Sequence, residues 1–187
     1  MQTTKSAGDK PISRTNDEVS MTGSVTTEAL QYLTFTLDQE RFAIDIRRIR
    51  EVLAFTSATK VPRTPDFMRG VINLRGNVVP VVDMRLKLGL TQTEKTVNTC
   101  VVITEVDVDG EKTVLGALAD SVQEVVDLAS DQIAPPPRMG TRIDTACIRG
   151  IGRRDDQFVV ILDIDRVLND DSETQKALRQ TQQGSIS

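Results

Sequence analysis

The stretch MRGVINLRGNVVPVVDMRLKLGL, residues 68–90, places two runs of apolar β-branched residues on either side of a polar centre. This arrangement is typical of a β-hairpin. Gly76 can adopt the positive φ that a short bulged hairpin loop requires, and Asn77 tolerates it. Arg75 is not needed for that geometry, so it is either a solvated loop residue or an interaction group.

The hairpin sequence occurs twice in the chain. RGVINLRGNVVPVVDMRLKL (69–88) aligns without a gap with RGIGRRDDQFVVILDIDRVL (149–168), at an offset of 80 residues. Upstream, IREV (49–52) resembles VQEV (122–125) at an offset of 73, so the second copy carries an insertion, for which APPPRMGTRIDTA is the candidate. The repeat predicts two similar β units in tandem, each a short barrel of about five strands.

The two copies differ at the hairpin tip. Arg75-Gly76-Asn77 in the first copy corresponds to Asp155-Asp156-Gln157 in the second, whereas Asp83 matches Asp163. An aspartate that follows a strand and precedes a short helix is a common N-cap. The fold therefore needs the strands and the aspartate but not the arginine, which favours an interaction role for Arg75.

Short apolar runs broken by turn residues indicate that the chain is mainly β. LTFTL and RFAID, within residues 33–45, predict one hairpin. TCVVITEV and KTVLGALAD, within residues 99–120, predict a second one with Asp109-Gly110 as its turn. FVVILDI (158–164) predicts a further buried strand, and DIRRIREVL (45–53) has apolar spacing sufficient for one or two helical turns.

Changes in composition divide the chain into three segments. Residues 1–27 are polar and lack apolar periodicity, which predicts a disordered N-terminal tail. Residues 28–170 are expected to form one domain that contains both β-barrel subdomains. Residues 171–187 are predicted to be a C-terminal helix and tail, in which Ala177 and Leu178 are the residues able to dock the helix.

The composition argues against an enzyme. Among 187 residues there is no histidine, which removes Ser-His and Cys-His nucleophile pairs and imidazole metal sites. No glycine-rich phosphate-binding motif is present, so we expect no enzymatic activity, no cofactor and no metal. Cys100 and Cys147 lie in apolar surroundings and are expected to be buried thiols of a cytoplasmic protein. No apolar run approaches membrane-spanning length, and the N-terminus does not resemble a secretion signal.

Charge is distributed unevenly along the chain. Residues 41–90, which we call the basic segment, hold ten Lys or Arg and four Asp or Glu. Residues 91–131, which we call the acidic segment, hold two Lys or Arg and nine Asp or Glu. One interpretation is that these segments are solvated faces. The other is that opposite faces complement a neighbour in a head-to-tail assembly that closes a ring.

Taken together, YLTFTLDQERFAIDIRRIREVL, KVPRTPDFMRGVINLRGNVVPVVDMRLKLGL and IRGIGRRDDQFVVILDIDRVL resemble the CheW family of bacterial chemotaxis coupling proteins. The resemblance covers roughly residues 30–170. It implies that residues 28–170 are two interleaved SH3-like five-stranded β-barrels in tandem around a shared core, with short helices and a C-terminal helix. It also implies a non-enzymatic adaptor that joins the cytoplasmic tips of methyl-accepting chemoreceptors to the regulatory domain of the histidine kinase CheA. The protein would then be cytoplasmic and recruited to membrane-associated receptor arrays.

The resemblance also implies site residues. The receptor-binding positions, in a groove between the subdomains, are Ile49, Glu51, Gly70, Arg75, Cys100, Val122 and Val125. Glu51 and Arg75 match a family pair of opposite charges. The kinase-binding positions are Ile44, Ile46 and Arg47. Core packing is the competing interpretation for the apolar members, and a backbone requirement is the competing one for Gly70.

Two other functions remain open from the sequence. A CheW-like adaptor could serve a non-flagellar chemosensory pathway that controls surface motility or development, since the same fold and groove would be used. A nucleic-acid-binding β-barrel could use the basic segment, but aromatic residues make up 3% of the chain, with one Tyr and no Trp. A stacking platform for bases is therefore nearly absent.

Overall fold

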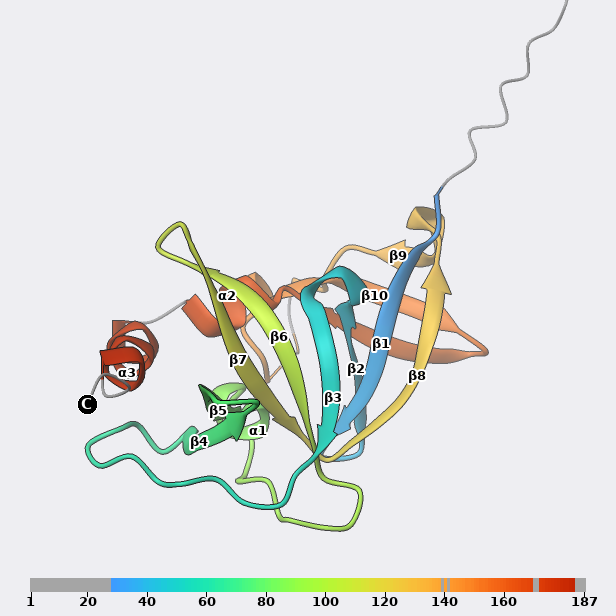
Figure 1. Ribbon diagram of the computed structural model, residues 1–187. Helices are drawn as coiled ribbons and strands as arrows, with labels where there is room; N and C mark the ends of the chain where they lie inside the picture. The colour runs from blue at the N-terminus through green and yellow to red at the C-terminus, as the bar shows by residue number, and fades with distance from the viewer. Residues whose placement is uncertain (1–27, 139, 141, 170–171, 184–187) are drawn as a thin grey trace, which may run out of the picture.

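The computed structural model describes residues 28–138, 140, 142–169 and 172–183 (Figure 1). The tail predicted over residues 1–27 lies outside the described residues. The strands are β1 (Leu30–Leu37), β2 (Glu40–Asp45), β3 (Ile49–Ala54), β4 (Met68–Leu74), β5 (Asn77–Asp83), β6 (Cys100–Val108), β7 (Glu111–Ala119), β8 (Ser121–Leu128), β9 (Ile133–Ala134), β10 (Ile148–Arg154) and β11 (Gln157–Leu162). The helices are α1 (Met84–Lys87), α2 (Ile164–Asn169) and α3 (Ser172–Gln183), with 3₁₀ turns η1 (Ile46–Arg48), η2 (Ser130–Gln132) and η3 (Thr145–Cys147).

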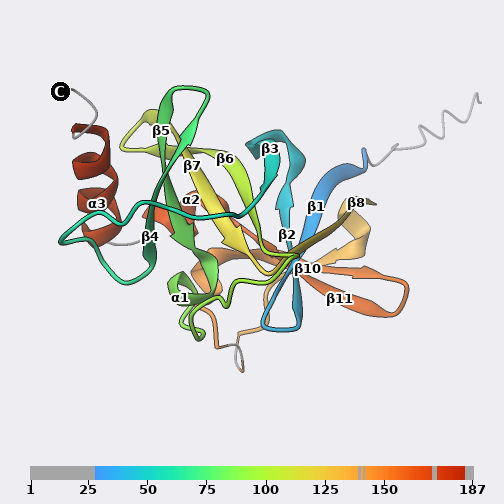
Figure 2. The same cartoon turned by 60° about the horizontal axis from the view of Figure 1, so that its bottom comes forward.

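The strands form two sheets of the same design. Sheet A has the order β8-β1-β2-β11-β10-β9, and sheet B has the order β3-β6-β7-β5-β4. Neighbouring strands are antiparallel except for one parallel pair in each sheet, β2 with β11 and β5 with β7. Each sheet curls into a small barrel, and Figure 2 shows the two barrels side by side. The predicted mainly β fold with two barrels is confirmed.

We call the barrel formed by sheet A barrel A and the barrel formed by sheet B barrel B. Each barrel combines strands from both repeats of the sequence. Barrel A combines the hairpin β1–β2 from the first repeat with β8, β10 and β11 from the second. Barrel B combines β3, β4 and β5 from the first repeat with the hairpin β6–β7 from the second. Each barrel is therefore completed by strands from both halves of the sequence, and the chain crosses between barrels at η1 and again between β7 and β8.

Strand register confirms the internal repeat. Gly70 lies opposite Val81 in barrel B, and Gly150 lies opposite Ile161 in barrel A, each just after a β-bulge. Both pairs agree with the offset of 80 residues. The seven-residue difference between the two offsets falls between β8 and β10, where the predicted insertion includes the end of β9.

The tip of the β4–β5 hairpin differs from the sequence interpretation. Leu74 pairs directly with Asn77, so the turn consists of Arg75 and Gly76 alone, with φ values of 52° and 87°. Asn77 is therefore a strand residue rather than part of a bulged loop. Two consecutive positive φ angles are the mark of a type I′ turn, which matches the right-handed twist of the strands. Arg75 itself adopts the left-handed conformation, which is unusual for a residue with a long side chain.

Of the one or two helical turns expected within residues 45–53, the structure contains one, and the rest of the segment is a strand. The segment forms only the single 3₁₀ turn η1, which Asp45 caps by accepting a hydrogen bond from the backbone N–H of Arg47 at 3.0 Å. From Ile49 the chain is the strand β3, paired with β6. The apolar spacing of Ile46, Ile49 and Leu53 fits a helix, but pairing with a strand 50 residues away outweighs it.

Three apolar clusters fill the space within and between the sheets. The central core lies between the sheets and includes Leu33, Phe35, Ile44, Val82 and Val102. The interior of barrel A holds Tyr32, Ala43, Val126 and Ile161, and that of barrel B holds Val81, Val101, Ile103 and Leu118. Because side chains alternate along a strand, each sheet turns one face to its own barrel and the other to the central core.

Two predictions at the strand and chain ends are confirmed. Asp83 accepts hydrogen bonds from the backbone N–H groups of Arg85 and Leu86, and so caps α1. Asp163 accepts one from the backbone of Arg166 at 3.3 Å. At the C-terminus, α3 is docked by Ala177 and Leu178, which are 2% and 1% exposed.

Candidate partner-binding surface

Arg75 and Glu51 form a bidentate ion pair. Arg75 donates from Nη1 to Oε1 of Glu51 at 2.6 Å and from Nη2 to Oε2 at 2.8 Å. Glu51 lies on β3 and Arg75 at the tip of the β4–β5 hairpin, and β3 and β4 are the two edge strands of sheet B. The ion pair therefore closes barrel B between its edges. The hydrogen bonds from Arg75 hold the pKa of Glu51 below its ordinary value.

A cavity of about 600 Å³ lies beside this ion pair. Its apolar wall is formed by Leu74, Val79, Ile103 and Val114, which belong to the interior of barrel B or pack against it. Arg50 lines the rim, and its guanidinium is held by Glu105 at 2.5 Å. The cavity is thus the open end of barrel B, with the Arg75–Glu51 pair across it.

Barrel A has no equivalent ion pair. The repeat places Asp155 where barrel B has Arg75, and Glu124 where barrel B has Glu51, so two carboxylates would face each other. Asp155 and Asp156 are instead 91% exposed. The matching cavity is larger, about 740 Å³, and Phe158 on its rim is 69% exposed. The difference between the hairpin tips is therefore a difference in how each barrel is closed.

Apolar side chains are exposed where the two sheets meet. Val52 on β3 is 41% exposed and Val125 on β8 is 47% exposed. Val52 lies opposite Val102, and Val125 lies opposite Leu33, both of which belong to the central core. The two valines therefore project from the edge strands of sheets B and A on the faces that enclose the central core.

Ile49 and Val122 extend this apolar surface. Each begins or nearly begins its edge strand, is half-buried, and packs against the central core. We call Ile49, Val52, Val122 and Val125 the apolar strip. In Figures 1 and 2, β3 and β8, which carry the strip, lie on either side of β1. Ile49 and Val122 are equivalent in the repeat, as are Val52 and Val125, so both barrels contribute alike.

Two predicted receptor-binding residues are buried. A methyl group at Gly70 would lie 2.2 Å from the carbonyl oxygen of Thr59, and the φ of Gly70 is 132°. Gly70 thus meets a backbone requirement, the alternative that the sequence left open. Cys100 is 7% exposed in the central core, and burial raises the pKa of its thiol. Cys147 is buried too, and neither cysteine forms a disulfide within the described residues.

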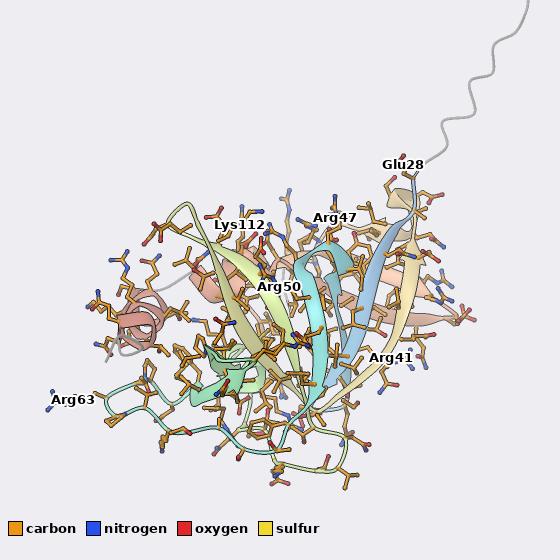
Figure 3. The ribbon with its side chains drawn as sticks, in the orientation of Figure 1. Glu28, Arg41, Arg47, Arg50, Arg63 and Lys112 are labelled. Atoms are coloured by element: carbon orange, nitrogen blue, oxygen red, sulfur yellow. The ribbon has the colours of Figure 1, made fainter. Side chains whose placement is uncertain are left out.

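The three predicted kinase-binding residues differ in exposure. Ile44 is 1% exposed and lies within the central core, so its side chain is not at the surface. Ile46 is half-buried. Arg47 is exposed at the turn between β2 and β3, as Figure 3 shows, and donates to both carboxylate oxygens of Asp45. Those hydrogen bonds lower the pKa of Asp45 despite the opposing effect of burial.

Val52 was missed by sequence reasoning, although the repeat contained the signal. Val125 was predicted, and the offset of 73 residues leads from Val125 to Val52. Alternation along β3 then places Val52 on the face opposite to Glu51. Glu51 therefore points to the interior of barrel B, whereas its neighbour Val52 points to the space between the barrels.

Much of the basic segment is neutralised within the molecule. Six of its arginines form ion pairs, namely Arg47, Arg48, Arg50, Arg69, Arg75 and Arg85. Two of the carboxylates, Glu105 and Asp120, belong to the acidic segment. Guanidinium groups that are paired with carboxylates make a poor phosphate-binding surface, since the counterion is already supplied by the protein. The nucleic-acid alternative therefore loses its electrostatic basis.

The described residues contain no cluster of His, Cys, Asp and Glu that could hold a metal ion. Likewise, within the part of the chain that the structure describes, every helix is too short or too polar to cross a membrane.

Comparisons with known proteins agree on one family. Residues 31–172 match the CheW-like domain family. The chain is 32% identical to the chemotaxis protein CheW of Klebsiella aerogenes, over 74% of this chain and 81% of that protein. The crystal structure of the scaffolding protein TtCheW from Thermoanaerobacter tengcongensis superposes with a TM-score of 0.67 at 34% identity, covering 75% of this chain and 88% of the other. Protein FrzA of Myxococcus xanthus is 31% identical over 59% of this chain and 66% of its own length.

Proposed function

The chain belongs to the CheW family of chemotaxis scaffolding proteins, and we propose that it joins the cytoplasmic tips of chemoreceptors to the histidine kinase CheA. The family consists of adaptors rather than enzymes, so the prediction of a non-enzymatic protein is confirmed. In this proposal the partners are the chemoreceptors and CheA, and the protein acts in a receptor array at the membrane.

The receptor side of the proposal rests on the apolar strip. Exposed valines at equivalent positions of two edge strands, 41% and 47% exposed, form an apolar surface between the barrels. A helical hairpin presents its own apolar side chains in a row along one face, and such a row suits an apolar groove. Burying the strip under that row removes apolar surface of both proteins from water, which drives association. This exposed apolar strip is the observation that carries the proposal.

The Arg75–Glu51 pair supports the receptor site indirectly. Glu51 directly precedes Val52, so the position of β3 that the ion pair holds is also the position of the strip valine. An exposed ion pair contributes little to stability, because water solvates both charges well. Its proposed role is to fix the edge strand of barrel B relative to the β4–β5 hairpin.

The kinase side is proposed at the turn between β2 and β3. Arg47 is exposed there and Ile46 is half-buried, so a partner can reach both side chains. Ile44 acts only from within the central core, by supporting the strand that leads into the turn. This surface lies on the chain segment that crosses from barrel A to barrel B.

A binding experiment with strip variants tests the proposal. Val52→Asp and Val125→Asp place a charge in the strip, whereas Val97→Asp is the matched control at a valine that is 98% exposed in a loop. The baits are a chemoreceptor cytoplasmic fragment and the CheA regulatory domain from the same genome. We expect the strip variants to bind the receptor at least about tenfold more weakly, since central apolar contacts dominate an interface. Kinase binding and the control variant should be unaffected.

Two results would contradict the proposal. The first is wild-type protein that binds neither bait. The second is strip variants that bind the receptor fragment as tightly as the wild type does. Circular dichroism of each variant would establish that the fold is intact in every comparison.

A non-flagellar chemosensory pathway is the second candidate. The similarity to FrzA over 59% of this chain is the observation that favours it. Receptor and kinase baits from such a pathway in the same genome would separate the two candidates. Preferential binding to those baits would assign the protein to surface motility or development instead of flagellar chemotaxis.

A further inference from the structure

Two ion pairs link the barrels beside the apolar strip. The first joins Arg85 on α1 to Asp120 between β7 and β8, with Arg85 Nε 2.9 Å from both carboxylate oxygens. Asp120 also accepts a hydrogen bond from the backbone N–H of Asp38, in the β1–β2 turn, at 2.8 Å. Since α1 follows β5 of barrel B and the β1–β2 turn belongs to barrel A, these contacts cross between the barrels. We call Arg85, Asp120 and Asp38 the first clamp.

The second clamp has the same design with the charges reversed. Arg48, the last residue of η1, pairs with Asp165 on α2, which follows β11 of barrel A. The other carboxylate oxygen of Asp165 accepts a hydrogen bond from the backbone N–H of Asp107, on β6 of barrel B, at 2.9 Å. In the repeat, Asp165 is the equivalent of Arg85. The second clamp therefore consists of Arg48, Asp165 and Asp107.

Each clamp holds the beginning of one strip strand. Asp120 directly precedes β8, which carries Val122 and Val125, and Arg48 directly precedes β3, which carries Ile49 and Val52. In both cases the edge strand of one barrel is tied to the helix that follows the other barrel. Additional bonds reinforce the ties, because the hydroxyl of Thr104 on β6 donates to the backbone carbonyl of Arg48 at 2.9 Å.

The first clamp is well shielded from water. The side chains of Arg85 and Asp120 are 16% and 19% exposed, against 37% and 25% for Arg48 and Asp165. The hydrogen bonds that Arg85 donates to Asp120 raise the pKa of its guanidinium, as expected for a cation held against a carboxylate. Shielded, hydrogen-bonded charges are directional and resist displacement by water, which suits them to fixing a relative position.

We propose that the two clamps are positioning elements that hold the two halves of the apolar strip at a fixed spacing. The inference rests on the proposed function, because the strip is the receptor-binding surface there. Arg85, Asp120, Arg48 and Asp165 do not contact the receptor in this arrangement. They act through the edge strands, so their loss widens the range of spacings between β3 and β8 and weakens receptor binding.

Asp120→Asn and Asp165→Asn test the clamps separately. Each keeps the size of the side chain and removes its charge, and the more exposed Asp165 offers the variant better able to fold. Arg153→Gln is the control, since Arg153 pairs with Asp156 inside one hairpin of barrel A. Distances between the barrels can be measured by electron spin resonance on labels at Gln31→Cys of β1 and Glu111→Cys of β7. Cys100→Ala and Cys147→Ala remove the native thiols from the background.

We expect both clamp variants to broaden the distance distribution between the labels and to bind the receptor fragment about tenfold more weakly. The control should change neither. The double variant Arg85→Gln/Asp120→Asn should be no weaker than Asp120→Asn alone, because both changes remove one interaction. A variant that merely lost stability would leave the distance distribution of its folded molecules unchanged.

The proposal is overturned if both clamp variants give the wild-type distance distribution, or if the distribution broadens while receptor binding stays the same. Wild-type protein that bound no receptor would instead contradict the proposed function. In that case the distance distributions alone would decide whether the clamps hold the strip, with broadening as support and no change as refutation.

Discussion

Arg75 reaches across the open end of barrel B to Glu51 and links the two edges of one sheet. The two hydrogen bonds, at 2.6 and 2.8 Å, join a hairpin tip to the opposite edge strand. Arg75 does so from a left-handed backbone conformation, with φ at 52°. In a type I′ turn this position favours Asn, Asp or Gly, so the arginine is present despite the turn and not because of it. That conflict between local geometry and residue choice points to a functional role.

Arg75→Asn should separate the turn from the ion pair. Asparagine followed by Gly76 is a preferred type I′ sequence, so the variant should be at least as stable as the wild type in urea denaturation. Receptor binding should fall about tenfold, because Glu51 then no longer holds β3 to the hairpin. Glu51→Gln, which also removes the pair, should reproduce the loss. Unchanged receptor binding in both variants would refute the role assigned to the pair.

Gly70→Ala should destabilise the fold. The added methyl group would lie 2.2 Å from the Thr59 carbonyl oxygen, and φ at 132° is unfavourable for alanine. We expect a loss of about 2–4 kcal/mol in the free energy of unfolding, measured by urea denaturation. Gly89→Ala is the control, since its φ is also positive, at 78°, but a methyl group there would meet nothing within 4 Å. Equal losses in the two variants would show that the approach of Thr59 is unimportant.

Asp45→Asn should make the free energy of unfolding less dependent on pH in the acid range. Hydrogen bonds from Arg47 lower the pKa of Asp45 below its ordinary value of 3.8. A carboxyl group with a lower pKa in the folded state stabilises above its unfolded pKa, and that contribution disappears as the pH falls through the folded pKa. Wild type should therefore lose more stability than the variant between about pH 5 and pH 2.

The same variant keeps the cap of η1, since asparagine is as good an N-cap as aspartate and its Oδ1 can also accept from the backbone N–H of Arg47. At neutral pH it loses only the ion pairs with Arg47 and Arg149, so denaturation at a series of pH values should find it only slightly less stable than the wild type there. Arg153→Gln serves as the control for an arginine–aspartate pair on the surface. A variant whose stability fell as steeply with acid as that of the wild type would contradict the assignment.

Leu178→Ala should show whether α3 belongs to the same cooperative unit as the barrels. Leu178 is 1% exposed, and truncating a buried leucine typically costs about 2–5 kcal/mol. Lys176→Ala, on the exposed face of α3, is the control and should be close to neutral. A single transition at lower urea concentration would mean that α3 unfolds with the barrels. Wild-type stability of the Leu178 variant would show that the helix contributes nothing to folding.

Interactions that are local in sequence were predicted well. The hairpins follow from alternating apolar residues and from turns such as Asp109-Gly110, which involve neighbours only. The N-cap role of Asp83 and the docking of α3 through Leu178 are local patterns of the same kind. The repeat and the family motifs added the two barrels, because similar segments fold alike. The strand β3, which follows the single helical turn within residues 45–53, was not predicted, since its pairing with β6 depends on residues far along the chain.

By itself, the amino-acid sequence determined the hairpins, the two-barrel repeat, the charge pair of Arg75 and Glu51, and membership in an adaptor family. Only the tertiary structure decided which apolar residues remain accessible. Ile44 and Val52 are both apolar strand residues, yet one lies in the central core and the other at a sheet edge. The packing of one sheet against the other decides which of these side chains is buried. That packing in turn requires each barrel to be built from strands of both halves of the chain. For the same reason the contact between Arg85 and Asp120 could not be predicted from periodicity in the sequence. The two residues are 35 positions apart and lie on different elements.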